Sequence, residues 1–253
     1  MLPRDIHVKE IDVKSKHPIY FTGPSLKKGK LPGVIYFSIG GKDSLSLDPF
    51  NQFVQFLSPS IRVFSWDLPF HTPPLKPEKA INAWAEDLSK GNDLFSAFLQ
   101  ESRNTIDYLL QNFCCLDQFA IVGLSRGAFF ALHLAAEKKI PRVLGFAPLL
   151  DLAFVKELQP FKGSTVLQKY ALKEKVPSLL ETSIRLFLGN HDTRVGSEKG
   201  FSFLQSLVKE AVQKKLRKFP FELEYYPSVG HLGHGTPPYI FQKGANWIET
   251  CMK

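Results

Sequence analysis

Cysteine and methionine are scarce in this 253-residue chain, which has three cysteines and two methionines. Cys114 and Cys115 are adjacent and Cys251 lies near the end, so there is no C-x-x-C pair and no cysteine–histidine spacing typical of a metal site. A sparse and odd set of cysteines indicates reduced thiols, as in the cytoplasm. We therefore expect a protein that binds no metal.

Long apolar runs are also missing. The most apolar stretch, Phe119–Ala136, is interrupted by Arg126 and His133, whereas a membrane helix needs roughly 18 uncharged residues. The start of the chain lacks the apolar region of a signal peptide. We expect a cytoplasmic protein without a membrane span.

Acidic residues are outnumbered, with 24 Asp and Glu against 32 Lys and Arg, which gives a net charge of +8. The basic residues form short, separate runs at 27–30, 138–139 and 214–218 without interleaved aromatic residues. A single-strand nucleic-acid surface combines both kinds of side chain, so we interpret the runs as solvated surface and expect no nucleic-acid partner. The phosphate-loop and G-x-G-x-x-G patterns are absent as well, and no cofactor is expected.

Strands and helices alternate along the chain, which has an ordinary share of 44% hydrophobic residues. Predicted strands cover 6–13, 17–23, 34–37, 61–66, 118–122, 142–146, 183–188 and 221–226. Predicted helices cover 48–57, 80–113 with a break at 90–92, 126–137, 197–215 and 239–251.

This alternation predicts an α/β protein with a mostly parallel central sheet of about eight strands and helices on both faces. The first two strands are predicted to form an antiparallel hairpin. The length fits one domain over residues 1–253. The segment 149–180 is irregular to helical and is predicted to form a small lid or insert. Ligands of such sheets bind at the carboxyl ends of the strands, which is where chemistry is expected.

One such position carries the pattern G-x-S-x-G, in the residues Gly123–Gly127 with Ser125 at its centre. The pattern follows the apolar run FAIV and precedes a helix of small residues, AFFALHLAA. A nucleophilic serine on a sharp strand-to-helix turn needs this context, because side chains two residues to either side would collide. The helix N-terminus adds free N–H groups near a developing oxyanion.

A serine nucleophile needs a general base, and the base needs an orienting acid. The loop SVGHLGHGTPP after the last predicted strand offers His231 and His234. Asp192, in GNHDTRVG after the strand 183–188, has the position expected of the acid, and Asp151, after the strand 142–146, is the alternative.

Ser125, Asp192 and then His231 or His234 follow the order Ser…Asp…His, each just beyond a predicted strand. In this the chain resembles the α/β-hydrolase superfamily. It looks most like small single-domain esterases near the dienelactone-hydrolase and prolyl-oligopeptidase-like branches. The motifs GLSRG, GNHDTRVG and SVGHLGHGTPP carry the resemblance, which extends over nearly the whole chain and implies an α/β-hydrolase fold.

The resemblance also implies roles for individual residues. Ser125 would be the nucleophile and Asp192 the orienting acid. His231 would be the base, because such histidines follow the last strand through Ser-Val-Gly, and His234 is the alternative. The backbone N–H of Arg126 would be one donor to the oxyanion.

The second oxyanion donor is expected from the loop after the strand 34–37. Where relatives often carry His-Gly, this chain has Ser38 and Ile39, followed by Gly40 and Gly41. The glycines keep the backbone freedom that is needed to aim an N–H inward, and Gly40 is the expected donor. The motif Asp67-x-Pro-x-His71 also resembles a loop of many relatives, where its carboxylate and imidazole hold a turn; a wall of the substrate pocket is the alternative. Phe70, Trp84, Phe95 and Phe98 are interpreted as core, with the lining of an acyl pocket as the alternative.

These features predict a serine hydrolase, a carboxylesterase that acts on small-molecule esters through an acyl-enzyme, as a monomer or homodimer. Other acyl chemistry on the same triad, that of a peptidase, thioesterase or acyltransferase, is one alternative. The absence of a propeller-sized domain disfavours an oligopeptidase. A non-catalytic binding protein on a hydrolase scaffold is the other alternative.

Overall fold

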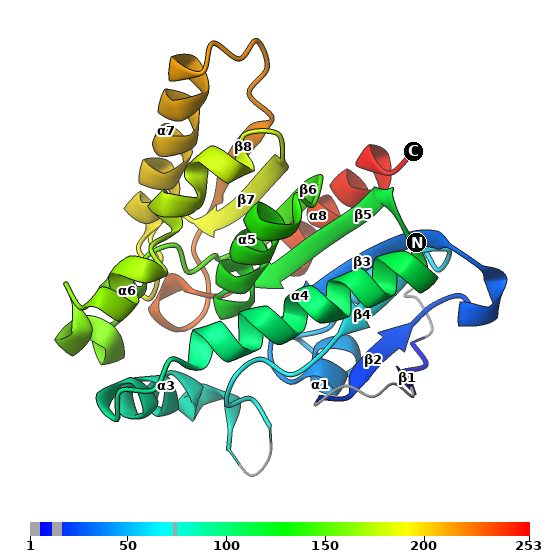
Figure 1. The fold of residues 1–253 in the computed structure, drawn as a ribbon, viewed down its shortest axis with the longest axis horizontal. Coiled ribbons are helices and arrows are strands. Elements are labelled where there is room, and N and C mark those ends of the chain that lie inside the picture. Colours follow the sequence, from blue (N-terminus) through cyan, green and yellow to red (C-terminus); the bar gives the residue numbers. More distant parts are fainter. Residues whose placement is uncertain (1–5, 12–16, 73–74) are drawn as a thin grey trace.

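The computed structural model describes residues 6–11, 17–72 and 75–253 (Figure 1). Within them the strands form an 8-stranded sheet in the order β1-β2-β4-β3-β5-β6-β7-β8. The strands are β1 Lys9–Ile11, β2 Ile19–Thr22, β3 Leu31–Phe37, β4 Arg62–Ser65, β5 Cys114–Leu124, β6 Arg142–Phe146, β7 Ser183–Gly189 and β8 Phe221–Tyr226. The end of the first predicted strand, 12–13, lies outside the described residues.

Strand direction divides the sheet into two parts. β1 pairs with β2 and β2 with β4 in antiparallel fashion, whereas every pairing from β4 through β3 to β8 is parallel. The predicted hairpin and mostly parallel sheet are confirmed. Because the parallel strands all end at one edge, the loops that follow β3, β4, β5, β6, β7 and β8 gather there.

Helices cover both faces of the sheet, as predicted. The α-helices are α1 Gly41–Ser46, α2 Gln52–Phe56, α3 Ala80–Ser89, α4 Leu94–Asn112, α5 Arg126–Lys138, α6 Thr165–Lys169, α7 Ser197–Gln213 and α8 Pro238–Cys251. The 3₁₀ helices are η1 Leu26–Lys28, η2 Pro77–Lys79, η3 Leu152–Phe154, η4 Lys156–Phe161, η5 Leu172–Leu179 and η6 His231–Gly233. None of the helices in the described ranges has the length and hydropathy needed to cross a bilayer.

Two apolar clusters fill the two faces. One contains side chains of α2 and α8 packed on the sheet, and the other contains side chains of α3, α4, α5, α7 and the segment between β6 and β7. In Figure 1, α4 and α5 lie in front of the sheet. Helix α5 is buried continuously from Gly127 to Ala136, which is the pattern of a helix covered on all sides.

Aromatic side chains pack densely against α5. The ring centroids of Trp84 and Phe95 lie 5.3 Å apart, and those of Phe98 and Phe130 lie 4.5 Å apart. All four side chains are buried, so they form core rather than an open pocket wall. Phe70 differs, since it is 39% exposed and has a φ of 60°.

The segment between β6 and β7 contains η3, η4, α6 and η5. Hydrogen bonds and an ion pair connect this segment to α5 and to Asp93 at the start of α4. His133 of α5 donates from Nε2 to the Tyr170 carbonyl oxygen at 3.1 Å, and the Tyr170 hydroxyl donates to the Asp93 carboxylate at 2.8 Å. Lys175 of η5 pairs with Glu137 of α5 at 2.9 Å.

Candidate active site

Ser125 lies on the turn between β5 and α5 with φ 53° and ψ −114°. A non-glycine residue at such angles costs about 1–3 kcal/mol and persists only where its surroundings hold it. Here the Ser125 N–H donates to the Phe146 carbonyl oxygen at 2.8 Å, and the Ser125 carbonyl oxygen accepts from Ala128 and Leu149, both at 3.1 Å. The turn is therefore fixed by β6 and by the loop that follows it.

The two glycines of the motif are required because the structure leaves no room for a Cβ atom at either position. A Cβ atom on Gly123 would lie 2.2 Å from the Ala128 nitrogen, and one on Gly127 would lie 2.1 Å from the Phe37 carbonyl oxygen. Both contacts are with backbone atoms, which cannot move aside as a side chain can. The close approach at Gly127 also brings the end of β3 against the first turn of α5.

A chain of hydrogen bonds connects Ser125 to a carboxylate through an imidazole. His234 Nε2 lies 2.9 Å from Ser125 Oγ, and His234 Nδ1 lies 2.7 Å from Asp192 Oδ2. A carboxylate only accepts, so a neutral imidazole donates from Nδ1 and keeps the Nε2 lone pair for the serine hydroxyl. This geometry suits proton transfer from serine to imidazole.

Asp192 is held on its other oxygen by the loop after β7. Its Oδ1 accepts from the N–H groups of Arg194 at 2.9 Å and Val195 at 3.1 Å. The carboxylate is buried, with 2% of the residue exposed. Three donors therefore fix the carboxylate in one orientation facing His234.

His231, the preferred base of the sequence analysis, does not occupy the place between Ser125 and Asp192; His234, the alternative, does. His231 is exposed at the start of η6. The reason is the backbone of this loop, which has positive φ at Gly230, Leu232 and Gly233.

Contacts within the loop and with the loop after β7 fix this conformation. The Leu232 carbonyl oxygen accepts from the Thr193 N–H at 2.9 Å, and the Gly235 N–H donates to the Val229 carbonyl oxygen at 2.8 Å. A Cβ atom on Gly233 would lie 2.2 Å from the His191 carbonyl oxygen. The loop is thus pressed against the loop after β7, and this brings His234 to the acid.

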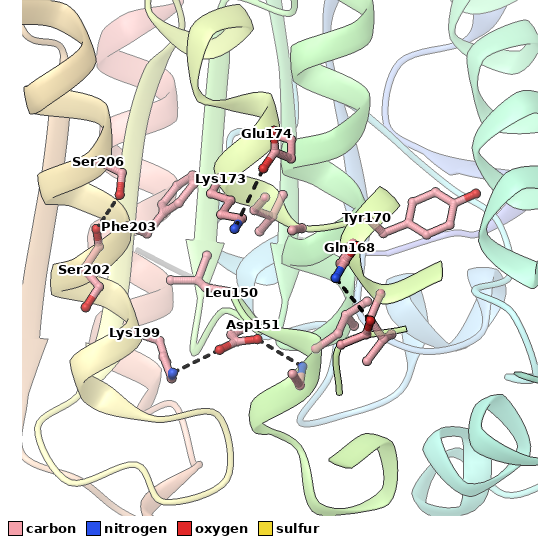
Figure 2. A pocket seen from close by; sticks show the side chains of 16 residues that line it. Leu150, Asp151, Gln168, Tyr170, Lys173, Glu174, Lys199, Ser202, Phe203 and Ser206 are labelled. Atoms are coloured by element: carbon pink, nitrogen blue, oxygen red, sulfur yellow. Dashed lines mark hydrogen bonds and ion pairs between the residues drawn. The ribbon is translucent and has the colours of Figure 1, made fainter. Parts of the chain in front are cut away.

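Asp151, the alternative acid, is engaged elsewhere. Its Oδ1 accepts from the Ala153 N–H at 3.0 Å and so begins η3, and its Oδ2 pairs with Lys199 Nζ at 2.9 Å. This pair lines a cavity of about 530 Å³ between the β6–β7 segment and α7 (Figure 2). Ser125, Asp192 and His234 do not line that cavity. A second hollow, of about 580 Å³, lies beside Asp192 and His191.

Most N–H groups of the loop after β3 donate to side chains. The N–H groups of Ser38 and Ile39 both donate to Ser44 Oγ, at 3.2 and 3.0 Å, and the Gly41 N–H donates to Asp67 Oδ1 at 2.6 Å. Among the described residues, the Gly40 N–H has no acceptor.

The N–H of Arg126, the first residue of α5, likewise has no acceptor in the described part of the chain. An α-helix leaves its first N–H groups without intrahelical partners. The N–H groups of Arg126 and Gly40, the two expected oxyanion donors, are therefore not engaged by other described residues.

The Asp67–His71 loop holds two turns. Asp67 accepts from the start of α1, and His71 Nδ1 donates to the Pro69 carbonyl oxygen at 2.8 Å. Burial, together with the charge of Arg126, lowers the pKa of His71 to about 3, so this imidazole is neutral near pH 7. Its Nε2 is buried and has no hydrogen-bond partner among the described residues.

Sequence reasoning considered Arg126 only for its backbone and did not single out Arg194 or Glu157. In the structure, the guanidinium of Arg194 makes two hydrogen bonds to the Glu157 carboxylate, at 2.8 and 3.0 Å. The only signal in the sequence was the position of Arg194, two residues after Asp192.

Comparison with known proteins finds no matching family model and no matching curated protein. Solved structures do match. TT1662 from Thermus thermophilus superposes with a TM-score of 0.72 at 15% identity, over 99% of this chain and 99% of that one. The S-formylglutathione hydrolase FrmB from Staphylococcus aureus superposes with a TM-score of 0.61 at 11% identity, over 100% of both chains.

A putative dipeptidyl aminopeptidase IV from Bacteroides ovatus also matches, with a TM-score of 0.65 at 13% identity. The match covers 97% of this chain and 36% of that longer one. At these identities the likeness concerns the fold, which this chain shares over nearly its whole length with proteins of its own size.

Proposed function

We propose that this chain, which has the α/β-hydrolase fold, is a serine hydrolase that cleaves carboxylic esters through an acyl-enzyme on Ser125. The hydrogen-bonded series from Ser125 through His234 to the buried Asp192 carries this proposal. The strained turn at Ser125 supports it, since strain that neighbouring groups maintain is typical of functional sites.

In the first half of the reaction, His234 Nε2 takes the proton of the Ser125 hydroxyl while Oγ attacks the ester carbonyl carbon. The N–H groups of Arg126 and Gly40 donate to the oxyanion that forms. Asp192 holds the imidazole in the required tautomer and stabilises the imidazolium. The imidazolium then protonates the departing alkoxide as the ester C–O bond breaks, which leaves the acyl group on Ser125.

In the second half, a water molecule replaces the alcohol. The water oxygen attacks the acyl carbon while His234 takes one proton from the water. The tetrahedral intermediate collapses, the bond to Ser125 Oγ breaks, and the imidazolium returns a proton to that oxygen. The carboxylic acid leaves and the enzyme is restored.

The segment 149–180 is proposed to cover this site as a small insert within a single domain. Its helix η4 packs against α3, and its Glu157 pairs with Arg194 of the loop that holds Asp192. Such a cover limits the size of the substrate, which favours small esters. The same triad could also serve thioester or amide substrates, because fold alone does not set the reaction.

Hydrolysis of a substrate panel tests the proposal. We expect p-nitrophenyl esters to give the highest kcat/KM, above acyl thioesters and aminoacyl amides. Ser125→Ala should lower kcat by about 10⁴-fold or more, and Ser89→Ala, at an exposed serine on α3, should not. A higher rate with thioesters or amides would move the activity to that class. Salt-sensitive binding of anionic partners without turnover would support the binding-protein alternative.

A further inference from the structure

Arg126 directly follows Ser125 and places a guanidinium among the loops at the carboxyl edge of the sheet. Its Nη1 donates to the carbonyl oxygen of Pro77, at the start of η2, at 3.0 Å. The side chain is half-buried and, within the described residues, forms no ion pair. A guanidinium has five N–H donors, and removing it from water without an anion is unfavourable. An anionic ligand would compensate for that cost.

Arg194 reaches the same region from the loop after β7. Its guanidinium is held by two hydrogen bonds to Glu157 of η4. Burial and the charge of Arg194 lower the pKa of Arg126 to about 10, which leaves Arg126 protonated near pH 7. The two cations therefore act on each other, Arg126 from the turn that contains Ser125 and Arg194 from the loop that contains Asp192.

The carboxylates of Glu157 and Glu78 act on Arg126 from a distance and partly offset the two cations by raising its pKa. Glu157 is engaged by Arg194, and Glu78 on η2 is exposed to solvent, where its charge is screened. The neighbouring imidazole of His71 is neutral near pH 7 and contributes no charge. Of these two arginines, Arg194 makes a direct ion pair with a carboxylate, and Arg126 makes none within the described residues.

We propose that Arg126, supported by Arg194, binds a carboxylate of the substrate, so that the preferred esters carry a free carboxylate a short distance from the ester bond. This inference rests on the proposed function, because it names the substrates of the same serine. The planar fork of arginine matches a carboxylate with two parallel hydrogen bonds. Consecutive Cα atoms lie about 3.8 Å apart, so Arg126 can reach a group a few bonds from the carbonyl that Ser125 attacks.

Two matched pairs of substrates test the inference, one for each side of the ester. On the acyl side, p-nitrophenyl hydrogen adipate is compared with p-nitrophenyl methyl adipate. On the alcohol side, 4-acetoxybenzoate is compared with methyl 4-acetoxybenzoate. After correction for the uncatalysed rates, the charged ester should have the higher kcat/KM in at least one pair by about tenfold. Added salt should reduce that preference.

Variants separate recognition from a structural role. Arg126→Gln should lower the charged-to-neutral ratio of kcat/KM by about 10- to 100-fold, as expected for hydrogen bonds to a charged group. Arg126→Lys should retain part of the ratio. Glu157→Gln should raise the ratio, because it frees Arg194 from its carboxylate. A purely structural role would change both esters of a pair equally and leave the ratio constant.

The result that overturns the inference is a ratio near one in both pairs, or an unchanged ratio in Arg126→Gln, while the neutral esters are still cleaved. Failure of the proposed function looks different. In that case none of the four esters is cleaved and Ser125 does not react with a fluorophosphonate, which would overturn both proposals.

Discussion

His234 Nε2 and Ser125 Oγ lie 2.9 Å apart although the two residues are 109 positions apart in the sequence. The contact exists because parallel strands end at one edge, so the turn after β5 and the loop after β8 converge there. Asp192, from the loop after β7, completes the series on the other side of the imidazole. The pairing of His234 with both residues distinguishes it from His231.

The two histidines of this loop should differ sharply when replaced. His234→Ala is expected to lower kcat for p-nitrophenyl acetate by about 10⁴- to 10⁶-fold, because the base is lost. His231→Ala, at an exposed side chain in the same loop, should leave kcat within about threefold of wild type. Steady-state kinetics of both variants checks this. A greater loss in His231→Ala would mean that the loop rearranges during catalysis.

Replacement of Asp192 tests the orienting carboxylate. In Asp192→Asn the amide oxygen can still accept from Arg194 and Val195, while the NH₂ group faces His234 Nδ1 and favours the wrong tautomer. We expect kcat to fall by about 10⁴-fold with little change in melting temperature. Asp151→Asn is the matched control, because Asp151 pairs with Lys199 instead. If Asp192→Asn kept a tenth of the activity, the assignment of the acid would be wrong.

Gly127 should tolerate no side chain. Its Cβ would lie 2.1 Å from the Phe37 carbonyl oxygen, whereas a Cβ on Gly91, which has φ +81°, would meet no heavy atom within 4 Å. Gly91→Ala is therefore expected to cost about 1–2 kcal/mol of stability from the backbone angle alone. Gly127→Ala should cost about 3 kcal/mol or more. Urea unfolding measures both, and equal costs would contradict the steric explanation of the motif.

Stability should depend on pH through His133. Burial, helped by the charge of Lys175, lowers the pKa of His133 to about 4, against an ordinary value of about 6.5. Between these values the unfolded chain binds a proton that the folded chain does not. Stability therefore falls as pH falls from about 6.5 to about 4.

The contribution of His133 to the slope is about 1.4 kcal/mol per pH unit. His133→Gln keeps a donor for the Tyr170 carbonyl oxygen and removes the titration, so its stability should fall less steeply over the same pH range. Unfolding free energies of both proteins at several pH values check this. Parallel curves would show that His133 is protonated without cost in the folded protein.

Much of the architecture could be predicted because buried parallel strands have a clear sequence pattern. β6 and β8 have the predicted bounds, and β7 extends one residue further. β6 and β7 are mainly apolar and buried, whereas β8, at the end of the sheet, mixes apolar residues with two glutamates. The turn at Ser125 was predicted from the G-x-S-x-G pattern. Gly123 is required by a local contact with Ala128, whereas Gly127 is required by the backbone of Phe37 on β3.

Other features depend on contacts that local sequence does not encode. Helix α1 begins right after Gly40 in a short polar stretch, where Asp67, 26 residues away, accepts from its first N–H. The choice between His231 and His234 depends on positive φ at Leu232 and on the hydrogen bond from Thr193. Neither is visible in a glycine-rich loop that could present either imidazole.

The central claim is that Ser125 is an activated nucleophile, and covalent labelling tests it most directly. Folded wild-type protein treated with a fluorophosphonate should gain the mass of one adduct. The adduct should be absent in Ser125→Ala, form much more slowly in His234→Ala, and form at the wild-type rate in His231→Ala. The account would be contradicted if folded wild-type protein gained no adduct, or if Ser125→Ala were labelled as completely as wild type.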